Sequence, residues 1–253
     1  MDGSPRQIVA FGGGGFSMEK DNTLLDDYVG GLVDCERPRV CFLPTASGDA
    51  DHYIVRFYRA FDATRFEPSH VSLFRRDGGA ADVHEHIVSS DIVYVGGGSV
   101  VSALGAWRAH GLDQTLRLAW ERGVVMCGAS AGSLCWFRSA LSAFHGPAQL
   151  VEGLGLLPYS NCVHFDCERD REGAFRQHLV DGMCAGFAAE DGAALHFVGE
   201  RLRAVVTSRP DARAFRMRRT EAGRVERRAL PTCYLGAADA PASAGGALVR
   251  IAA

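Results

Sequence analysis

A single serine of this 253-residue chain is surrounded by the smallest residues available. Gly128-Ala129-Ser130-Ala131-Gly132 follows the apolar run VVMC. In a G-x-S-x-G elbow a strand turns sharply into a helix, and the flanking glycines are needed because larger side chains would collide. A serine on such a turn stands at a helix N-terminus, where free N–H groups and the helix dipole favour negative charge. The pattern therefore predicts Ser130 as a nucleophile, in preference to a serine that only caps a helix.

A serine nucleophile needs a base to take its proton, and nine histidines are available. His164 stands apart because it follows an apolar, strand-like stretch about one α/β unit after Ser130. In an α/β-hydrolase the histidine comes much later, so we expect a different serine fold. Cys162, His164 and Cys167 also form C-x-H-x-x-C, but this spacing matches no structural zinc pattern and no fourth ligand is evident. No metal site is therefore expected.

Two glycine-rich stretches, residues 12–15 and 96–99, each follow an apolar strand-like run. The first is not followed by the acidic residue that closes the second strand of a dinucleotide-binding fold, and it lacks the Gly-Lys-Ser/Thr of a phosphate-binding loop. Both are interpreted as tight turns at the carboxyl edge of a sheet, where ligands of open α/β sheets bind. We expect the N–H of Ala131, with that of Gly97 or Gly98, to hold a developing oxyanion.

The elements that must position these residues alternate along the first two-thirds of the chain. Strands are expected at residues 6–11, 39–44, 69–74, 91–99 (ending in glycines) and 123–128, and helices near 20–33, 51–62, 100–110 and 112–122. Strands that are apolar on both faces and alternate with helices predict a mostly parallel sheet with helices on both faces. After residue 190, short strands with turn signals predict antiparallel hairpins at one edge. No linker or repeat is evident, so residues 1–253 are expected to form a single α/β domain.

Composition narrows the classes of partner. Hydrophobic residues make up 47% of the chain and the formal net charge is -3, so nothing draws the protein to nucleic acid or to a membrane. Ten arginines lie between residues 201 and 228, and we interpret them as the solvated face of hairpins because acidic residues are mixed among them. No run is long enough to span a bilayer, so a cytoplasmic protein with eight reduced cysteines is expected.

Five motifs in order resemble the peptidase E family, which includes aspartyl dipeptidases and the related cyanophycinases: FGGGGFSME, FLPTASGD, YVGGGS, GASAGSLCWF and GLGLLPYSNCVHFD. The resemblance runs from about residue 8 to 208. It implies a compact α/β fold like that of class I glutamine amidotransferases, with serine in place of their catalytic cysteine. It implies Ser130 as nucleophile, His164 as base, and Gly98 and Ala131 as oxyanion donors. Ser99 stands where family members often carry asparagine, and is a candidate for a substrate contact.

The third member of the triad departs from the family pattern. Family members usually carry an acidic residue shortly before a Gly-Pro pair, and the corresponding position here is Ala143. No Asp or Glu occurs between Ser130 and Glu152, so another group must orient His164. The candidates are Ser142, His145, Glu152, Asp166 and a backbone carbonyl, of which Ser142 and Glu152 are favoured.

Specificity is expected to come from an arginine. In aspartyl dipeptidases of this family an arginine after the catalytic histidine holds the substrate's aspartate side chain, which suits the planar, bidentate guanidinium. Arg169 and Arg171 follow His164 here, and Arg171, at the start of a predicted helix, is favoured. The alternative is a surface arginine paired with Asp170 or Glu172.

Three functions remain open from the sequence. The first is a serine peptidase of small peptides, dipeptidase-like with an Asp-Xaa preference. The second is another serine hydrolase or a cyanophycinase-like enzyme, and the third is a catalytically degenerate homologue that binds a ligand. We expect a small peptide substrate, no cofactor, no metal, no nucleic-acid or membrane partner, and a monomer or homodimer.

Overall fold

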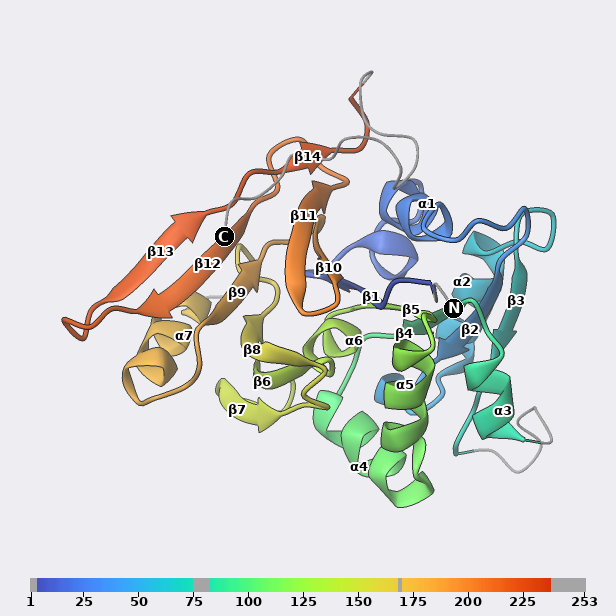
Figure 1. Ribbon diagram of the computed structural model, residues 1–253, viewed down its shortest axis with the longest axis horizontal. Coiled ribbons are helices and arrows are strands. Elements are labelled where there is room, and N and C mark those ends of the chain that lie inside the picture. Colours follow the sequence, from blue (N-terminus) through green and yellow to red (C-terminus); the bar gives the residue numbers. More distant parts are fainter. Residues whose placement is uncertain (1–3, 75–81, 168–169, 238–253) are drawn as a thin grey trace.

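The larger of two sheets carries the parallel core of the fold. The computed structural model describes residues 4–74, 82–167 and 170–237. Eight strands pair in the order β14-β11-β10-β1-β5-β4-β2-β3 (Figure 1). Its parallel strands are β1 (Gln7–Phe11), β2 (Arg39–Leu43), β3 (Glu67–His70), β4 (Ile92–Val95) and β5 (Val125–Ala129). The sheet continues through β10 (Ala193–Val198), β11 (Arg201–Thr207) and β14 (Cys233–Tyr234). Because β10 is antiparallel to β1 and to β11, the sheet is mixed.

Helices cover both faces of this sheet, as the sequence predicted. One face packs on α1 (Leu24–Gly30) and α2 (Asp51–Ala60), and the other on α3 (Val83–Val88), α4 (Val100–His110), α5 (Leu112–Glu121) and α6 (Ala131–Leu134). Along β1, Ile8 and Ala10 join the core under α4 and α5, whereas Val9 and Phe11 join the core under α1 and α2. Residues of a strand that alternate between two cores must all be apolar.

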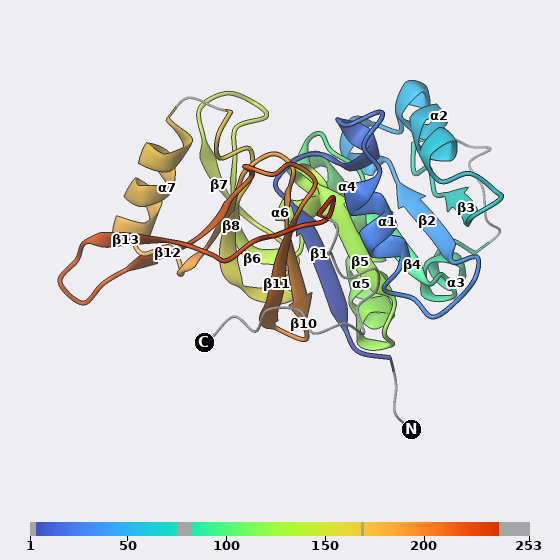
Figure 2. The same cartoon turned by 90° about the horizontal axis from the view of Figure 1, so that it is seen from above.

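A second sheet of six strands is the main difference from the expected architecture. It comprises β13 (Val225–Ala229), β12 (Ala214–Arg219), β9 (Gly186–Ala189), β8 (Leu157–Cys162), β6 (Phe137–Ser142) and β7 (Gln149–Glu152), in that order. Helix α7 (Arg171–Val180) packs on it through Phe175 and Leu179 (Figure 2). Of the two predicted hairpins, β10–β11 extends the first sheet, while β12–β13 belongs to the second. The elements remain those of one α/β fold.

The helix after the elbow ends after four residues, at Leu134, and β6 begins at Phe137. The buried pair Trp136-Phe137 favours a strand, because aromatic side chains fit a pleated, half-buried surface. The carbonyl oxygens of Cys135 and Trp136 accept from the N–H groups of Leu154 and Leu157, at 2.7 and 3.0 Å. These bonds tie the end of the elbow to the second sheet.

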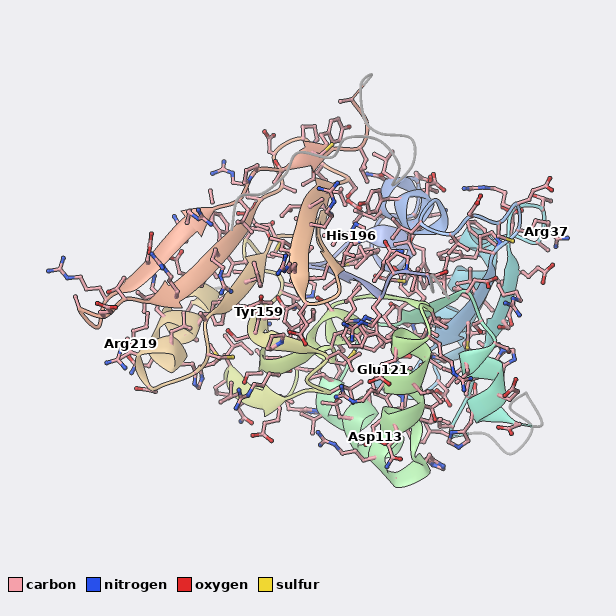
Figure 3. All side chains as sticks on the ribbon, in the orientation of Figure 1. Arg37, Asp113, Glu121, Tyr159, His196 and Arg219 are labelled. Carbon is pink, nitrogen blue, oxygen red and sulfur yellow. The ribbon has the colours of Figure 1, made fainter. Side chains whose placement is uncertain are left out.

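Aromatic rings join the two sheets. Tyr159 of β8 stacks on Phe197 of β10 with 6.2 Å between ring centroids, and Phe187 of β9 meets Phe197 edge-on at 5.4 Å. Figure 3 shows Tyr159 in the middle of the molecule, with Arg37 and Arg219 at opposite ends.

No helix within the described residues is both long and apolar enough to cross a membrane.

One predicted strand, residues 69–74, is shifted in the structure. Strand β3 covers Glu67–His70, and the chain then leaves the sheet. The Phe74 N–H donates to a carboxylate oxygen of Asp49 at 2.8 Å instead of to a neighbouring strand.

Candidate active site

Ser130 lies on the strand-to-helix turn that the sequence predicted. It follows β5 directly, with φ 56° and ψ -115°, and α6 begins at the next residue. A Cβ atom added at Gly128 would lie 2.4 Å from the carbonyl oxygen of Val95, and one added at Gly132 would lie 2.1 Å from the same oxygen. Both glycines of the pattern are thus required by the close approach of the elbow to the end of β4.

His164 lies just beyond the end of β8 in the second sheet. Its φ is 53°, and its backbone N–H donates to the carbonyl oxygen of Gly12 at 3.1 Å. The ring Nδ1 hydrogen bonds to Oδ1 of Asp191 at 2.6 Å. Asp191 lies in the short link between β9 and β10, with only 6% of its side chain exposed. The imidazole is therefore held by a carboxylate carried on the segment that passes from one sheet to the other.

The electrostatics of this pair favour a charged Asp191. Burial raises the pKa of Asp191, but the hydrogen bond and charge of His164 and the hydrogen bond from Cys167 outweigh it, so the pKa lies below its usual value. An ionised carboxylate accepts a hydrogen bond from the N–H at Nδ1, which leaves Nε2 as the acceptor of the neutral ring. This tautomer is the one a general base requires.

Neither favoured candidate for the orienting group contacts His164. Ser142 pairs with Gln149, and Glu152 with Ser139, in the β6–β7 ladder. The prediction of Ser142 or Glu152 is corrected by the geometry, which puts Asp191 against the ring. The reason is topological, since β7 is the outermost strand of the second sheet and β6 lies beside it, whereas the β9–β10 link crosses to the first sheet.

His145 and Asp166, the other two side chains considered for orienting His164, bond to Ser99 and to the backbone of Asp191. His145 bonds through Nε2 to the Ser99 hydroxyl at 2.7 Å. Asp166 accepts from the backbone N–H of Asp191 at 2.9 Å. Sequence reasoning missed Asp191, for which the available signal was an acidic residue before glycine in the turn between two apolar strands, Glu190-Asp191-Gly192.

Two backbone N–H groups near Ser130 remain suited to an oxyanion. The N–H of Gly97 donates to the Tyr53 hydroxyl at 2.9 Å, so this N–H is already engaged and is not an oxyanion donor. In the part of the chain that the structure describes, the N–H groups of Gly98 and Ala131 donate to no protein acceptor. Gly98 has a φ of 135°, and a Cβ there would lie 2.1 Å from the Ala46 carbonyl oxygen. Of the two glycines expected as oxyanion donors, the geometry therefore favours Gly98 over Gly97.

Ser130 and His164 line one pocket of about 300 Å³, near the lower limit for small-molecule sites. Its other lining residues are Ser17, Met18, Ser47, His52, Tyr53, Arg56 and Gly97. Among the described residues that line the pocket, only Arg56 has a permanently charged side chain. Helix α2 and the turn after β1 therefore form a wall of the pocket beside Ser130 and His164.

The two predicted substrate contacts lie elsewhere. Arg171 is buried and lines a different pocket of about 570 Å³, together with Ala143, and its Nη1 donates to the Leu141 carbonyl oxygen at 3.3 Å. Arg169 lies outside the described residues. Ser99 caps α4 by accepting from the Ser102 N–H at 3.1 Å. Both Arg171 and Ser99 are thus engaged in holding helices, and the structure does not bring them into the pocket of Ser130.

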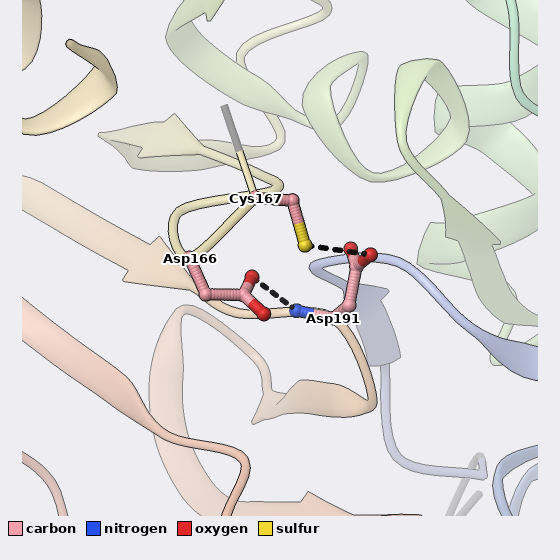
Figure 4. A group of neighbouring side chains, drawn as sticks. All are labelled: Asp166, Cys167 and Asp191. Atoms are coloured by element: carbon pink, nitrogen blue, oxygen red, sulfur yellow. Dashed lines mark hydrogen bonds between the residues drawn. The ribbon is translucent and has the colours of Figure 1, made fainter. Parts of the chain in front are cut away.

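A group of potential metal ligands adjoins the pair. Ligand atoms of Asp166, Cys167 and Asp191 lie within 4.8 Å of one another (Figure 4). Both carboxylate oxygens of Asp191 already accept hydrogen bonds, from His164 and from Cys167. Cys162 is buried at the end of β8 and does not join this group, so the three residues of C-x-H-x-x-C do not converge.

The model of peptidase family S51 matches residues 8–205. A Bacillus subtilis (strain 168) protein described as "Uncharacterized peptidase YgaJ" is 45% identical over 232 residues, which cover 91% of this chain and 100% of that protein.

Two solved structures resemble this one. A peptidase from an acI-B1 Actinobacterium has a TM-score of 0.65 and 16% identity, and the match covers 90% of this chain and 95% of that one. A putative peptidase E protein from Listeria monocytogenes EGD-e has a TM-score of 0.57 and 15% identity, and the match covers 81% and 98%. At these identities the two structures show a shared fold.

Proposed function

Because the chain belongs to peptidase family S51 and is a serine peptidase, we propose that it hydrolyses short peptides through Ser130, His164 and Asp191. The observation that carries the proposal is the 2.6 Å hydrogen bond from His164 to Asp191, in a residue pair whose histidine shares a pocket with Ser130. A nucleophile, a base and a group that orients the base are the minimum for this chemistry.

The steps assign one role to each group. His164 Nε2 takes the proton of Ser130 as Oγ attacks the scissile carbonyl carbon, and Asp191 stabilises the imidazolium that forms. The N–H groups of Gly98 and Ala131 bind the oxyanion of the tetrahedral intermediate. The imidazolium gives its proton to the leaving amine as the C–N bond breaks, and water then hydrolyses the acyl-enzyme by the same steps.

The substrate preference is assigned to α2. His52 and Arg56 stand four residues apart, so they share one face of the helix, and both line the pocket of Ser130. Arg56 donates to the Ser17 carbonyl oxygen, which holds the guanidinium at the pocket wall. Among the described residues that line the pocket, none is acidic. A peptide that presents a carboxylate to Arg56 is favoured, so the Asp-Xaa preference rests on Arg56 in place of Arg171.

Turnover of Asp-Leu, Asn-Leu and Ala-Leu tests this function. We expect Asp-Leu to be the best substrate and Ser130→Ala to abolish turnover of all three. Arg56→Ala should lower kcat/KM for Asp-Leu by about ten- to a hundredfold, because a hydrogen bond to a charged group is lost, and should leave Ala-Leu much less affected. Arg59→Ala is the matched control, since Arg59 is an exposed arginine on the same helix that does not line the pocket.

Each contrary result has a distinct meaning. Peptide turnover by Ser130→Ala at the wild-type rate contradicts the assignment of Ser130 as the nucleophile. Equal rates on the three dipeptides contradict the role of Arg56 and leave the nucleophile standing. Turnover of p-nitrophenyl esters without peptide turnover identifies another kind of serine hydrolase, and a folded protein that binds dipeptides without turnover identifies a ligand-binding homologue.

A further inference from the structure

The turn that follows His164 closes around Asp191. The Cys167 thiol donates to Oδ2 of Asp191, with 3.3 Å between sulfur and oxygen. The carboxylate of Asp166 accepts from the Asp191 N–H at 2.9 Å, and both contacts are drawn in Figure 4. The turn is closed by the Cys167 N–H, which donates to the His164 carbonyl oxygen at 3.3 Å. Three residues of this turn, His164, Asp166 and Cys167, therefore hold the side chain and the backbone of one aspartate.

These contacts divide the two oxygens of Asp191 between two donors. Oδ1 accepts from the His164 ring and Oδ2 from the Cys167 thiol. A carboxylate held through one oxygen can rotate about its Cβ–Cγ bond, because this terminal torsion has a broad energy profile. A second donor on the other oxygen restricts the rotation and so fixes the direction in which Oδ1 faces the imidazole.

The thiol is suited to this role because it keeps its proton. Desolvation and the carboxylates of Asp166 and Asp191 raise the pKa of Cys167 to about 12. The nucleophilic form of cysteine is the thiolate, so Cys167 acts near neutral pH as a donor and is a poor nucleophile. Its contact with an ionised carboxylate is also stronger than a bond between neutral groups.

We propose that Cys167 is a positioning residue of this enzyme, whose S–H group fixes the Asp191 carboxylate in the orientation that holds His164 for proton transfer. The inference rests on the proposed function of Ser130, His164 and Asp191. The backbone of Cys167 contacts that of His164, but its thiol bonds to Asp191 and Cys167 is not among the described residues that line the pocket, so the effect of the thiol passes through Asp191.

Cys167→Ala and Cys167→Ser separate this role from a merely structural one. The alanine variant loses the donor, and we expect kcat for a dipeptide to fall by about three- to tenfold with KM little changed, the size of one modest hydrogen bond. The serine variant retains an O–H donor at the same position and should recover most of the kcat. Cys35→Ala is the control, because Cys35 is an exposed cysteine outside the site. Thermal melting of every variant checks the fold.

A double-mutant comparison makes the route through Asp191 testable. In an Asp191→Asn background, Cys167→Ala should cost little more, because the carboxylate that it positions is absent. The inference is overturned if Cys167→Ala keeps the wild-type kcat, if serine restores nothing, or if the loss is as large in the Asp191→Asn background. Failure of the proposed function gives a different pattern, in which Ser130→Ala keeps its activity whatever stands at position 167.

Discussion

Positive φ angles occur at two of the residues to which we assign catalytic roles. Four non-glycine residues of the described part have a positive φ, and two of them are Ser130 and His164. Such conformations are costly for residues with a Cβ and persist only where the surroundings impose them. At Ser130 the surroundings are the two close contacts of Gly128 and Gly132 with Val95. At His164 they are the bonds to Gly12 and Asp191. The same contacts that strain the backbone aim the two side chains.

The orienting role of Asp191 is tested by its removal. Asp191→Asn preserves the shape but presents an amide to Nδ1, so the ring loses the tautomer that leaves Nε2 free to accept. We expect kcat to fall by roughly 10³- to 10⁴-fold on peptides, as measured by steady-state hydrolysis.

Glu152→Gln and Ser142→Ala are the controls for this prediction, because both residues lie in the β6–β7 ladder away from His164. Both variants should remain close to the wild-type rate. A large loss of kcat in either variant, together with nearly full activity in Asp191→Asn, would show that a residue of the β6–β7 ladder orients His164.

The first glycine turn serves the site by letting the β9–β10 link pass close to it. A Cβ at Gly12 would lie 2.3 Å from the Glu190 carbonyl oxygen. A Cβ at Gly13 would lie 2.1 Å from Oδ1 of Asp191 and 2.9 Å from Cε1 of His164. The sequence predicts a tight turn with a close backbone approach at this place, and in the structure the segment that approaches it is the β9–β10 link.

Replacing glycine by alanine is expected to lower kcat at Gly13 and to raise the stability of the fold at Gly105. At Gly13 the new methyl group overlaps the His164–Asp191 bond, so we expect a large loss of kcat. At Gly105, exposed within α4 with no atom within 4 Å of an added Cβ, alanine should stabilise the protein by about 1 kcal/mol. Peptide turnover and urea denaturation measure the two effects. Full activity in Gly13→Ala would show that the pair does not need this contact.

Local signals explain what the sequence predicts well and what it misses. The elbow at Ser130, the glycine turns and the buried strands each depend on residues close in sequence, and they are found where expected. The roles that we propose for Asp191 and Arg56 depend on which elements meet in space. Nothing near His164 in the sequence indicates that the β9–β10 link packs against it, and nothing in α2 indicates that its exposed face lines the pocket. The second sheet was missed for the same reason, since β8 pairs with β6 on one side and with β9 on the other, and stretches of intervening chain separate these strands in the sequence.

At the scale of the whole molecule, the site lies where the two sheets meet. Ser130 stands at the end of β5 in the first sheet, and His164 follows β8 in the second. Asp191 lies on the segment between β9 and β10, one strand in each sheet. Relative movement of the sheets would therefore separate the base from the nucleophile, and the aromatic contacts of Tyr159, Phe187 and Phe197 resist it.

A buried acid beneath the first glycine turn gives the fold a predictable pH dependence. Asp26 of α1 is 4% exposed, and burial raises its pKa from 3.8 to about 7. Between these values the folded protein holds a proton that the unfolded chain has released, so the free energy of unfolding falls as the pH rises from about 4 to about 7. Asp26→Asn removes this contribution.

Calorimetric melting of wild type and Asp26→Asn at pH 5 and pH 8 measures the effect. The Tm of the variant relative to wild type should be higher at pH 8 than at pH 5, with each kcal/mol worth roughly 2–4 °C in a protein of this size. The same Tm difference at both pH values would mean that Asp26 titrates alike in the folded and unfolded states.

The nucleophile can be tested directly by covalent labelling. A fluorophosphonate reacts with a serine only where a base activates the hydroxyl and donors accept the developing oxyanion. We predict that the folded wild-type protein incorporates one phosphonate group, located at Ser130 by mass spectrometry of its peptides. Asp191→Asn should be labelled far more slowly and Ser130→Ala not at all. An unlabelled wild-type protein that is fully folded, or a label on any other residue, would contradict the account.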